Sequence, residues 1–140
     1  MSLVNNIETV IPQRMPFVMI SELVHSDDLT STSTFEVKAD NIFLKDHHLQ
    51  EPALVENIAQ TAAARAGYMA SQEQRPVTIG YIAAIQNLEV LELPVLGDRL
   101  STEIRIMNQV FDVTLIGASV SCGGKKIATC EMKIFITKQS

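Results

Sequence analysis

The segment at residues 52–70 constrains this chain most, because it reads as a helix with almost no polar face. Its small residues are Ala53, Ala59, Ala62, Ala63, Ala64, Ala66, Gly67 and Ala70. Arg65 is the one charge after Glu56. Pro52 suits the first turn of a helix, where Glu51 and Glu56 lie near the positive end of the helix dipole. A helix that is apolar nearly all round must be surrounded by protein, so the sequence predicts one central helix.

The stretches on either side of this helix have the composition of β-strands. Residues 17–24 predict a largely buried strand, and the β-branched run at residues 30–38 predicts a second strand, antiparallel to the first after a turn at residues 26–28. Beyond the helix, residues 77–91 predict another strand, and the pattern breaks at residues 93–98. Three further strands each have one mainly apolar face, formed by Leu100, Thr102, Ile104 and Ile106; by Asp112, Thr114, Ile116, Ala118 and Val120; and by Ala128, Cys130, Met132, Ile134 and Ile136.

These predicted elements have one simple way to bury each other. An antiparallel sheet with one apolar face can curl around the apolar helix, which gives an α+β architecture. A chain of 140 residues has the usual size of one domain and can bury well over half of its unfolded surface. We therefore expect a single domain over residues 1–140.

Net charge and hydropathy exclude several classes of function. The formal charge is −5 and the pI is near 5.1, and the basic residues are scattered, so the chain has no electrostatic footprint for nucleic acid or an anionic membrane surface. No apolar run reaches the roughly 18–20 residues that span a bilayer, and the N-terminal residues lack the basic start of a secretion signal. We expect a cytoplasmic protein.

The two cysteines stand in predicted partner strands of one hairpin that turns at Gly123 and Gly124. With that turn, Lys125 faces Cys122, and roughly Gly117 faces Cys130. The two sulfurs would then lie beyond disulfide reach. We expect both cysteines to be small core or edge residues without a redox or nucleophilic role.

A pair of histidines precedes the predicted helix, and a glutamate follows in its first turns. His48 and Glu56 stand eight positions apart, and they can take and give a proton, which suits general acid–base catalysis on a substrate held at the helix N-terminus. His47 competes with His48 for the role of base, and Glu56 could instead be a favourable charge near the helix N-terminus. A metal site is not expected, because Asp46, His47 and His48 are adjacent, whereas zinc ligands converge from separated positions.

Several stretches carry a resemblance to a known family. Ile-Pro-Gln-Arg-Met-Pro-Phe at residues 11–17 resembles Leu-Pro-His-Arg-x-Pro-Phe, and residues 41–48 resemble Asn-x-Pro-Phe-Phe-x-Gly-His. Residues 56–60 match Glu-x-x-Ala-Gln. Downstream, Gly-Tyr-Ile-Ala-Ala-Ile at residues 80–85 and Pro-Val-Leu-Gly-Asp-Arg-Leu at residues 94–100 parallel a strand and the turn after it. In order and spacing, these motifs resemble those of the hotdog-fold 3-hydroxyacyl-acyl-carrier-protein dehydratases over nearly the whole chain.

This resemblance implies a hotdog fold, in which an antiparallel sheet wraps around one central α-helix. It also implies dehydration of a 3-hydroxyacyl thioester to the trans-2-enoyl thioester in fatty-acid or polyketide-like synthesis, without a metal or bound cofactor. His48 would be the base and Glu56 the acid, from different subunits of a dimer. Ala53 or Leu54 would supply the N–H that polarises the thioester carbonyl. The other implied substrate-binding residues are Gln60, Tyr81 and Ala84.

The implied partners are an acyl carrier protein or coenzyme A, which would carry the substrate, and a second subunit. That subunit would make a homodimer or higher homo-oligomer, or a heterodimer with a paralogue.

The chain also departs from the family pattern. Its loop between the histidine and the glutamate is shorter, and it lacks the glycine whose N–H would meet the thioester carbonyl. Gln13 replaces a histidine, and Ala84 stands where a glycine is common. These departures indicate a divergent member. Two alternatives stay open, namely a hotdog acyl thioesterase and a non-catalytic subunit of a dehydratase heterodimer.

Overall fold

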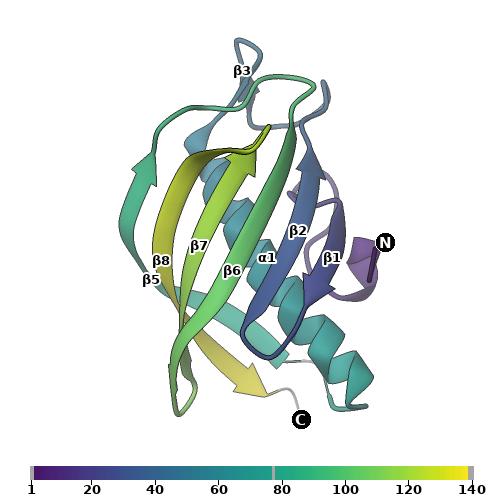
Figure 1. The fold of residues 1–140 in the computed structure, drawn as a ribbon. Helices are drawn as coiled ribbons and strands as arrows, with labels where there is room; N and C mark the ends of the chain where they lie inside the picture. Colours follow the sequence, from purple (N-terminus) through teal and green to yellow (C-terminus); the bar gives the residue numbers. More distant parts are fainter. Residues whose placement is uncertain (1, 77, 139–140) are drawn as a thin grey trace.

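One long helix lies against the concave face of a six-stranded antiparallel sheet in the computed structural model of this protein (Figure 1). The structure describes residues 2–76 and 78–138. The helix α1 spans Glu51–Gln72, and the strand order is β1-β2-β6-β7-β8-β5. The strands of this sheet are β1 (Glu22–Ser26), β2 (Thr30–Glu36), β5 (Thr78–Val90), β6 (Arg99–Val110), β7 (Val113–Cys122) and β8 (Lys125–Lys138). The predicted α+β hotdog architecture is confirmed.

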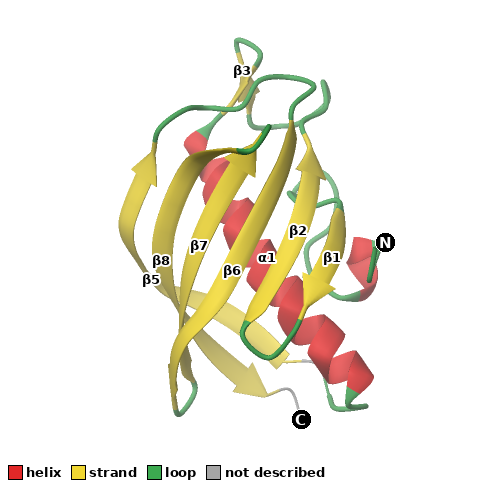
Figure 2. Ribbon diagram, in the orientation of Figure 1, coloured by secondary structure: helices red, strands yellow, loops and turns green. Residues whose placement is uncertain are grey.

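Two smaller elements lie outside the main sheet (Figure 2). A short 3₁₀ helix, η1 (Ile7–Thr9), lies near the N-terminus. The strands β3 (Leu44–Lys45) and β4 (His48–Leu49) form a hairpin of their own just before α1.

The central position predicted for the helix is confirmed, because no residue of α1 between positions 53 and 70 is exposed. Its covered side is nevertheless partly polar. Asn57, Gln60 and Thr61 are 0% exposed, whereas Ala59 and Ala63 are only half-buried. The polar side chains of the helix thus face the protein interior.

Each of these buried polar groups has a hydrogen-bond partner on another element. Asn57 donates from Nδ2 to the Met19 carbonyl at 2.8 Å, and its Oδ1 accepts from the Thr102 hydroxyl at 2.5 Å. The Thr61 hydroxyl contacts the Ser33 hydroxyl at 2.7 Å. Paired groups of this kind stabilise a buried helix in one orientation, because any rotation would leave them unsatisfied.

The first strand begins later than the sequence indicates. The prediction was residues 17–24, but β1 starts at Glu22, and residues 18–20 are buried in an irregular segment. The backbone groups of Met19 bond to helix side chains instead of to a strand: its N–H donates to Gln60 Oε1 at 2.7 Å, and its carbonyl accepts from Asn57. The predicted second strand is confirmed as β2, antiparallel to β1.

The alternation of inward and outward side chains that is predicted for the last three strands is confirmed with one exception. The inward positions of β6, β7 and β8 are buried or half-buried, but Asp112 is exposed in the turn between β6 and β7. The side chain of Ile136 lies outside the described residues.

The cysteines are both free, as predicted. Cys122 faces Lys125, while Cys130 faces Ala118, one residue from the predicted Gly117, because a bulge lies between Val120 and Ser121. Burial raises the pKa of the Cys130 thiol, which disfavours the reactive thiolate.

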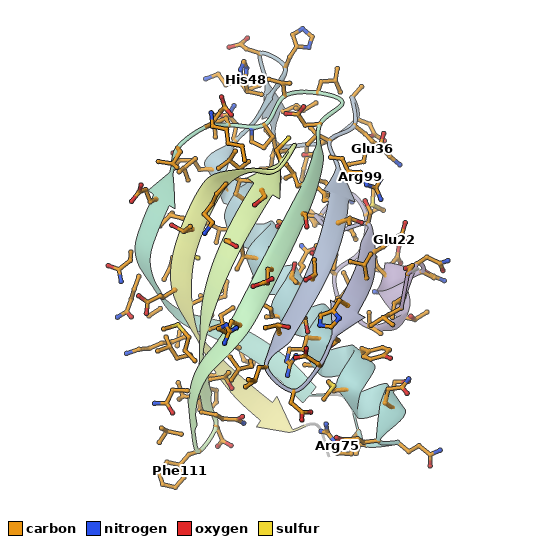
Figure 3. All side chains as sticks on the ribbon, in the orientation of Figure 1. Glu22, Glu36, His48, Arg75, Arg99 and Phe111 are labelled. Atoms are coloured by element: carbon orange, nitrogen blue, oxygen red, sulfur yellow. The ribbon has the colours of Figure 1, made fainter. Side chains whose placement is uncertain are left out.

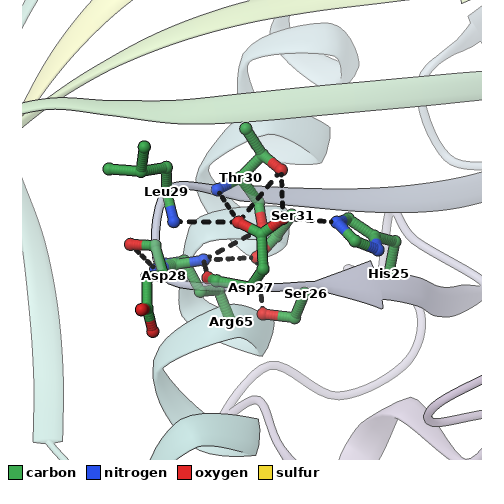
Figure 4. Close-up of polar contacts among 8 residues, drawn as sticks. All are labelled: His25, Ser26, Asp27, Asp28, Leu29, Thr30, Ser31 and Arg65. Carbon is green, nitrogen blue, oxygen red and sulfur yellow. Dashed lines mark hydrogen bonds and ion pairs between the residues drawn. The ribbon is translucent and has the colours of Figure 1, made fainter.

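Arg65 ties α1 to the turn between β1 and β2 (Figure 4). Its guanidinium donates to the carbonyls of Asp27 at 2.6 Å, Asp28 at 2.8 Å and Thr30 at 3.1 Å, and to the Ser31 hydroxyl at 2.9 Å. The Asp27 carboxylate also accepts the Thr30 N–H at 2.8 Å. This hydrogen bond from the Thr30 backbone is the main reason why the pKa of Asp27 lies well below its ordinary value. The charge of Arg65 therefore has a structural role.

Candidate active site

The two histidines lie on the β3–β4 hairpin, at the end of the molecule opposite Phe111 (Figure 3). The two turn residues, Asp46 and His47, have left-handed backbone φ values of 53° and 64°. The hairpin is anchored to the segment before β6, since Leu96 N–H donates to the His47 carbonyl at 2.9 Å and Leu49 N–H donates to the Pro94 carbonyl at 2.8 Å. Sequence reasoning missed this hairpin because Asp-His is not a typical sequence for a two-residue turn.

The His48 ring has a defined tautomer. Its Nδ1 lies 2.8 Å from the Asp46 carbonyl oxygen, and a carbonyl can only accept, so Nδ1 carries the proton. In a neutral ring with this tautomer, Nε2 carries the free lone pair. Within residues 2–76 and 78–138, the His47 ring makes no hydrogen bond of this kind. The hairpin backbone thus orients the His48 ring.

The Glu56 side chain is half-buried and is held by Gln60. Gln60 Nε2 lies 3.2 Å from Glu56 Oε1 and also donates to the Phe17 carbonyl at 2.8 Å. Gln60 itself is fully buried, with its Oε1 bonded to the Met19 N–H. The amide therefore connects the irregular segment before β1 to the carboxyl group of Glu56 and fixes the direction of that group.

Glu56 borders a cleft of about 1000 Å³ between α1 and the sheet. The helix contributes a row of small and flexible residues, Ala59, Ala63, Ala66 and Met69. The sheet contributes aliphatic side chains, among them Ile82, Ile104, Ile106, Ile116 and Ile134. Gln13 and Arg14 of the N-terminal segment line the same cleft. Charged residues also line the cleft, namely Glu8, Arg14, Asp28, Arg65, Arg75 and Asp112. The aliphatic part of the wall next to the Glu56 carboxyl suits an acyl chain with a polar reacting centre.

The remaining predicted residues lie in different surroundings. Ala53 and Leu54 are fully buried, and the Ala53 N–H donates to the Gln50 carbonyl at 3.0 Å. The prediction that Ala53 offers a free donor is therefore wrong, because the first helical turn uses this N–H itself. The role of Leu54 stays a prediction.

The two residues predicted on β5 are not equivalent. Tyr81 lines the cleft but is 57% exposed, and it faces Phe135 across the ladder. Its neighbour Ile82 faces Ile134, which is a buried residue of the cleft wall. Ala84 is absent from the described cleft lining. Sequence reasoning missed Ile82, which lines the cleft next to Tyr81 although its side chain is 41% exposed.

The single chain does not bring His48 into the cleft beside Glu56. The described residues that line the cleft include Glu56 but not His48. A second chain is one way to supply the missing imidazole.

Two kinds of feature are absent from the described residues. In residues 2–76 and 78–138, no three His, Cys, Asp or Glu side chains are grouped as a metal site would require. Across the same residues, no helix has the length and hydropathy of a membrane span.

A family model and the relatives similar in sequence both point to dehydratases. The model of the ApeP-like dehydratases matches residues 5–140. The chain is similar to the 3-hydroxyacyl-acyl-carrier-protein dehydratase FabZ of Clostridium botulinum strain Loch Maree, with 29% identity over 140 residues and 96% of each chain covered. FabZ of Brucella ovis is 27% identical over 134 residues, which cover 91% of this chain and 84% of the relative.

Solved structures show the same fold. The dehydratase heterocomplex ApeI:P from Xenorhabdus doucetiae matches with a TM-score of 0.88 at 16% identity, over 95% of this chain and 91% of the other. The PaaI protein of the Escherichia coli phenylacetic acid degradation operon matches with a TM-score of 0.66 at 14% identity, over 81% of this chain and 80% of the other. With its family model matched over nearly the full length, this chain belongs to the ApeP-like dehydratase family.

Proposed function

We propose that this protein dehydrates a 3-hydroxyacyl thioester to the trans-2-enoyl thioester. His48 Nε2 takes the proton from C2, and the C2–C3 double bond forms as the C3–O bond breaks. Glu56 gives its proton to the departing hydroxyl, which leaves as water. The observation that carries this proposal is the Glu56 carboxyl, held by Gln60 in the wall of a cleft lined mainly by small and aliphatic side chains.

The direct test supplies 3-hydroxyacyl thioesters of several chain lengths, on acyl carrier protein and on coenzyme A. Enoyl absorbance and thiol release are followed in parallel. We expect enoyl product without thiol release, and faster turnover on acyl carrier protein, which is the carrier for which the similar FabZ dehydratases are named. Thiol release without enoyl product would identify a thioesterase instead.

We further propose that a second subunit completes the site along β5. This strand is at the edge of the sheet, and within the described residues it pairs only with β8. Its exposed apolar residues are Tyr81, Ile82, Ile85 and Leu88. An unpaired edge strand with exposed apolar side chains is suited to pairing with another chain. Such pairing would carry His48 of one subunit toward Glu56 of the other.

An Ile85→Lys substitution tests the role of β5. The charge should oppose edge pairing, so we expect a monomer by light scattering and loss of dehydratase activity with the fold retained by circular dichroism. Leu29→Lys is the matched control, because Leu29 is 54% exposed in the β1–β2 turn, away from β5. An Ile85→Lys protein that keeps the oligomeric state of the wild type would rule out this interface.

Light scattering and the dehydratase assay on the wild-type protein distinguish a homodimer from a heterodimer. An active homodimer would show that one chain suffices. An inactive protein that gains activity with a paralogous dehydratase subunit would show a heterodimer, the kind of assembly named for the similar ApeI:P complex.

A further inference from the structure

The Gln13 side chain has an unexplained buried acceptor. Its Oε1 is covered by protein and has no hydrogen-bond partner, and no other buried side-chain nitrogen or oxygen of the described chain lacks one. Gln60 makes a clear contrast, because both of its amide atoms are bonded. Gln13 also lines the same cleft as Glu56.

A buried acceptor without a donor destabilises the free protein. The terminal torsion of glutamine is soft, so a small rotation can turn the oxygen toward the cleft. The missing donor is therefore expected to arrive with a ligand in the cleft.

We propose that Gln13 Oε1 accepts a hydrogen bond from the 3-hydroxyl group of the substrate. This inference rests on the proposed dehydratase function. A hydroxyl group can donate a hydrogen bond to Gln13 and still present its own oxygen as an acceptor, and Glu56 lines the same cleft. The enoyl product has lost this hydroxyl and cannot make the bond. Gln13 would thus be a specificity-determining residue that favours substrate over product.

The test measures binding without reaction. Amide analogues of 3-hydroxyacyl-pantetheine and of the matched saturated acyl-pantetheine replace the thioester sulfur with nitrogen, which makes the C2 proton much less acidic. We expect wild-type protein to bind the hydroxylated analogue about tenfold more tightly by calorimetry, the factor that about 1.4 kcal/mol gives. In Gln13→Leu this preference should vanish, while affinity for the saturated analogue is unchanged.

The stability of the Gln13→Leu protein provides a second test, because this variant should lose the hydroxyl preference without losing stability. Gln13→Leu removes an unsatisfied buried acceptor, so its unfolding midpoint should equal or exceed that of the wild type. Gln13→His should keep the preference for the hydroxylated analogue, because an imidazole nitrogen can accept the same bond. Gln72→Leu, an exposed position at the end of α1 outside the cleft, should match the wild type.

Three results would overturn the inference. Gln13→Leu could keep the hydroxyl preference, it could lose affinity for both analogues equally, or it could unfold or dissociate more easily than the wild type. The last result would mean that the protein itself satisfies the acceptor. Dehydratase activity is read separately on wild-type protein with thioesters, so failure of the proposed function is distinguished from failure of this inference.

Discussion

Replacing Glu56 with glutamine should lower the turnover number for dehydration about 100-fold or more while leaving the fold and the oligomer intact. A positioned general acid contributes roughly 10²–10⁴-fold to a rate, and an amide cannot give up a proton in its place. The substitution is nearly isosteric. Its amide oxygen can still accept from Gln60 Nε2, which lies 3.2 Å from the present carboxylate oxygen. The geometry of the cleft should therefore survive.

His48→Ala should cause a loss of similar size, again about 100-fold or more, because it removes the proposed base. His47→Ala is the matched control. It changes the adjacent residue of the same hairpin, and we expect it to stay close to the wild-type rate. Rates are measured with a 3-hydroxyacyl thioester under saturating conditions, and light scattering checks the oligomer. A normal rate in Glu56→Gln or His48→Ala, or a large loss in His47→Ala, would show that the roles are assigned to the wrong residues.

Gly67→Ala should destabilise the protein by about 2–3 kcal/mol. In an ordinary helix this substitution stabilises by roughly 1 kcal/mol. Here the N-terminal segment passes so close to α1 that an added Cβ would lie 2.1 Å from the Val10 carbonyl oxygen. That neighbour is backbone, so the clash can be relieved only by moving the chain.

Chemical denaturation of Gly67→Ala and wild type gives the free energy of unfolding directly. Ser71→Ala, at an exposed position near the end of the same helix, should change stability by less than about 0.5 kcal/mol. A gain of stability in Gly67→Ala would mean that the N-terminal segment does not rest on the helix as the structure places it.

Local sequence patterns were sufficient for most of the fold. The central helix, the strand β2 and the alternation in β6, β7 and β8 follow from residues that are neighbours in sequence. The turn at Gly123 and Gly124 is equally local, and both glycines adopt the positive φ that the turn requires.

Features that depend on distant contacts could not be predicted. The late start of β1 follows from hydrogen bonds between Met19 and two helix residues, the closer of which is 38 positions away. The place of Ile82 in the cleft lining, beside Tyr81, follows from the pairing of β5 with β8. No local pattern contains either piece of information.

The candidate site was predictable in its residue types but not in its arrangement. Glu56 and Gln60 were both expected in the site from the family resemblance, and the structure places them in contact. The tautomer of His48 depends on the left-handed turn before it. The unpaired oxygen of Gln13 depends on burial that only the folded chain defines.

The two sides of α1 have consequences for how this family can diversify. One side carries Asn57 and Thr61, whose hydrogen bonds to other segments fix the orientation of the helix. The other side carries the alanines that border the cleft. Enlarging an alanine would reshape the space for the acyl chain without touching the bonds that orient the helix. The residues that shape the cleft can therefore change while the hydrogen bonds that orient the helix, and with it Glu56, stay the same.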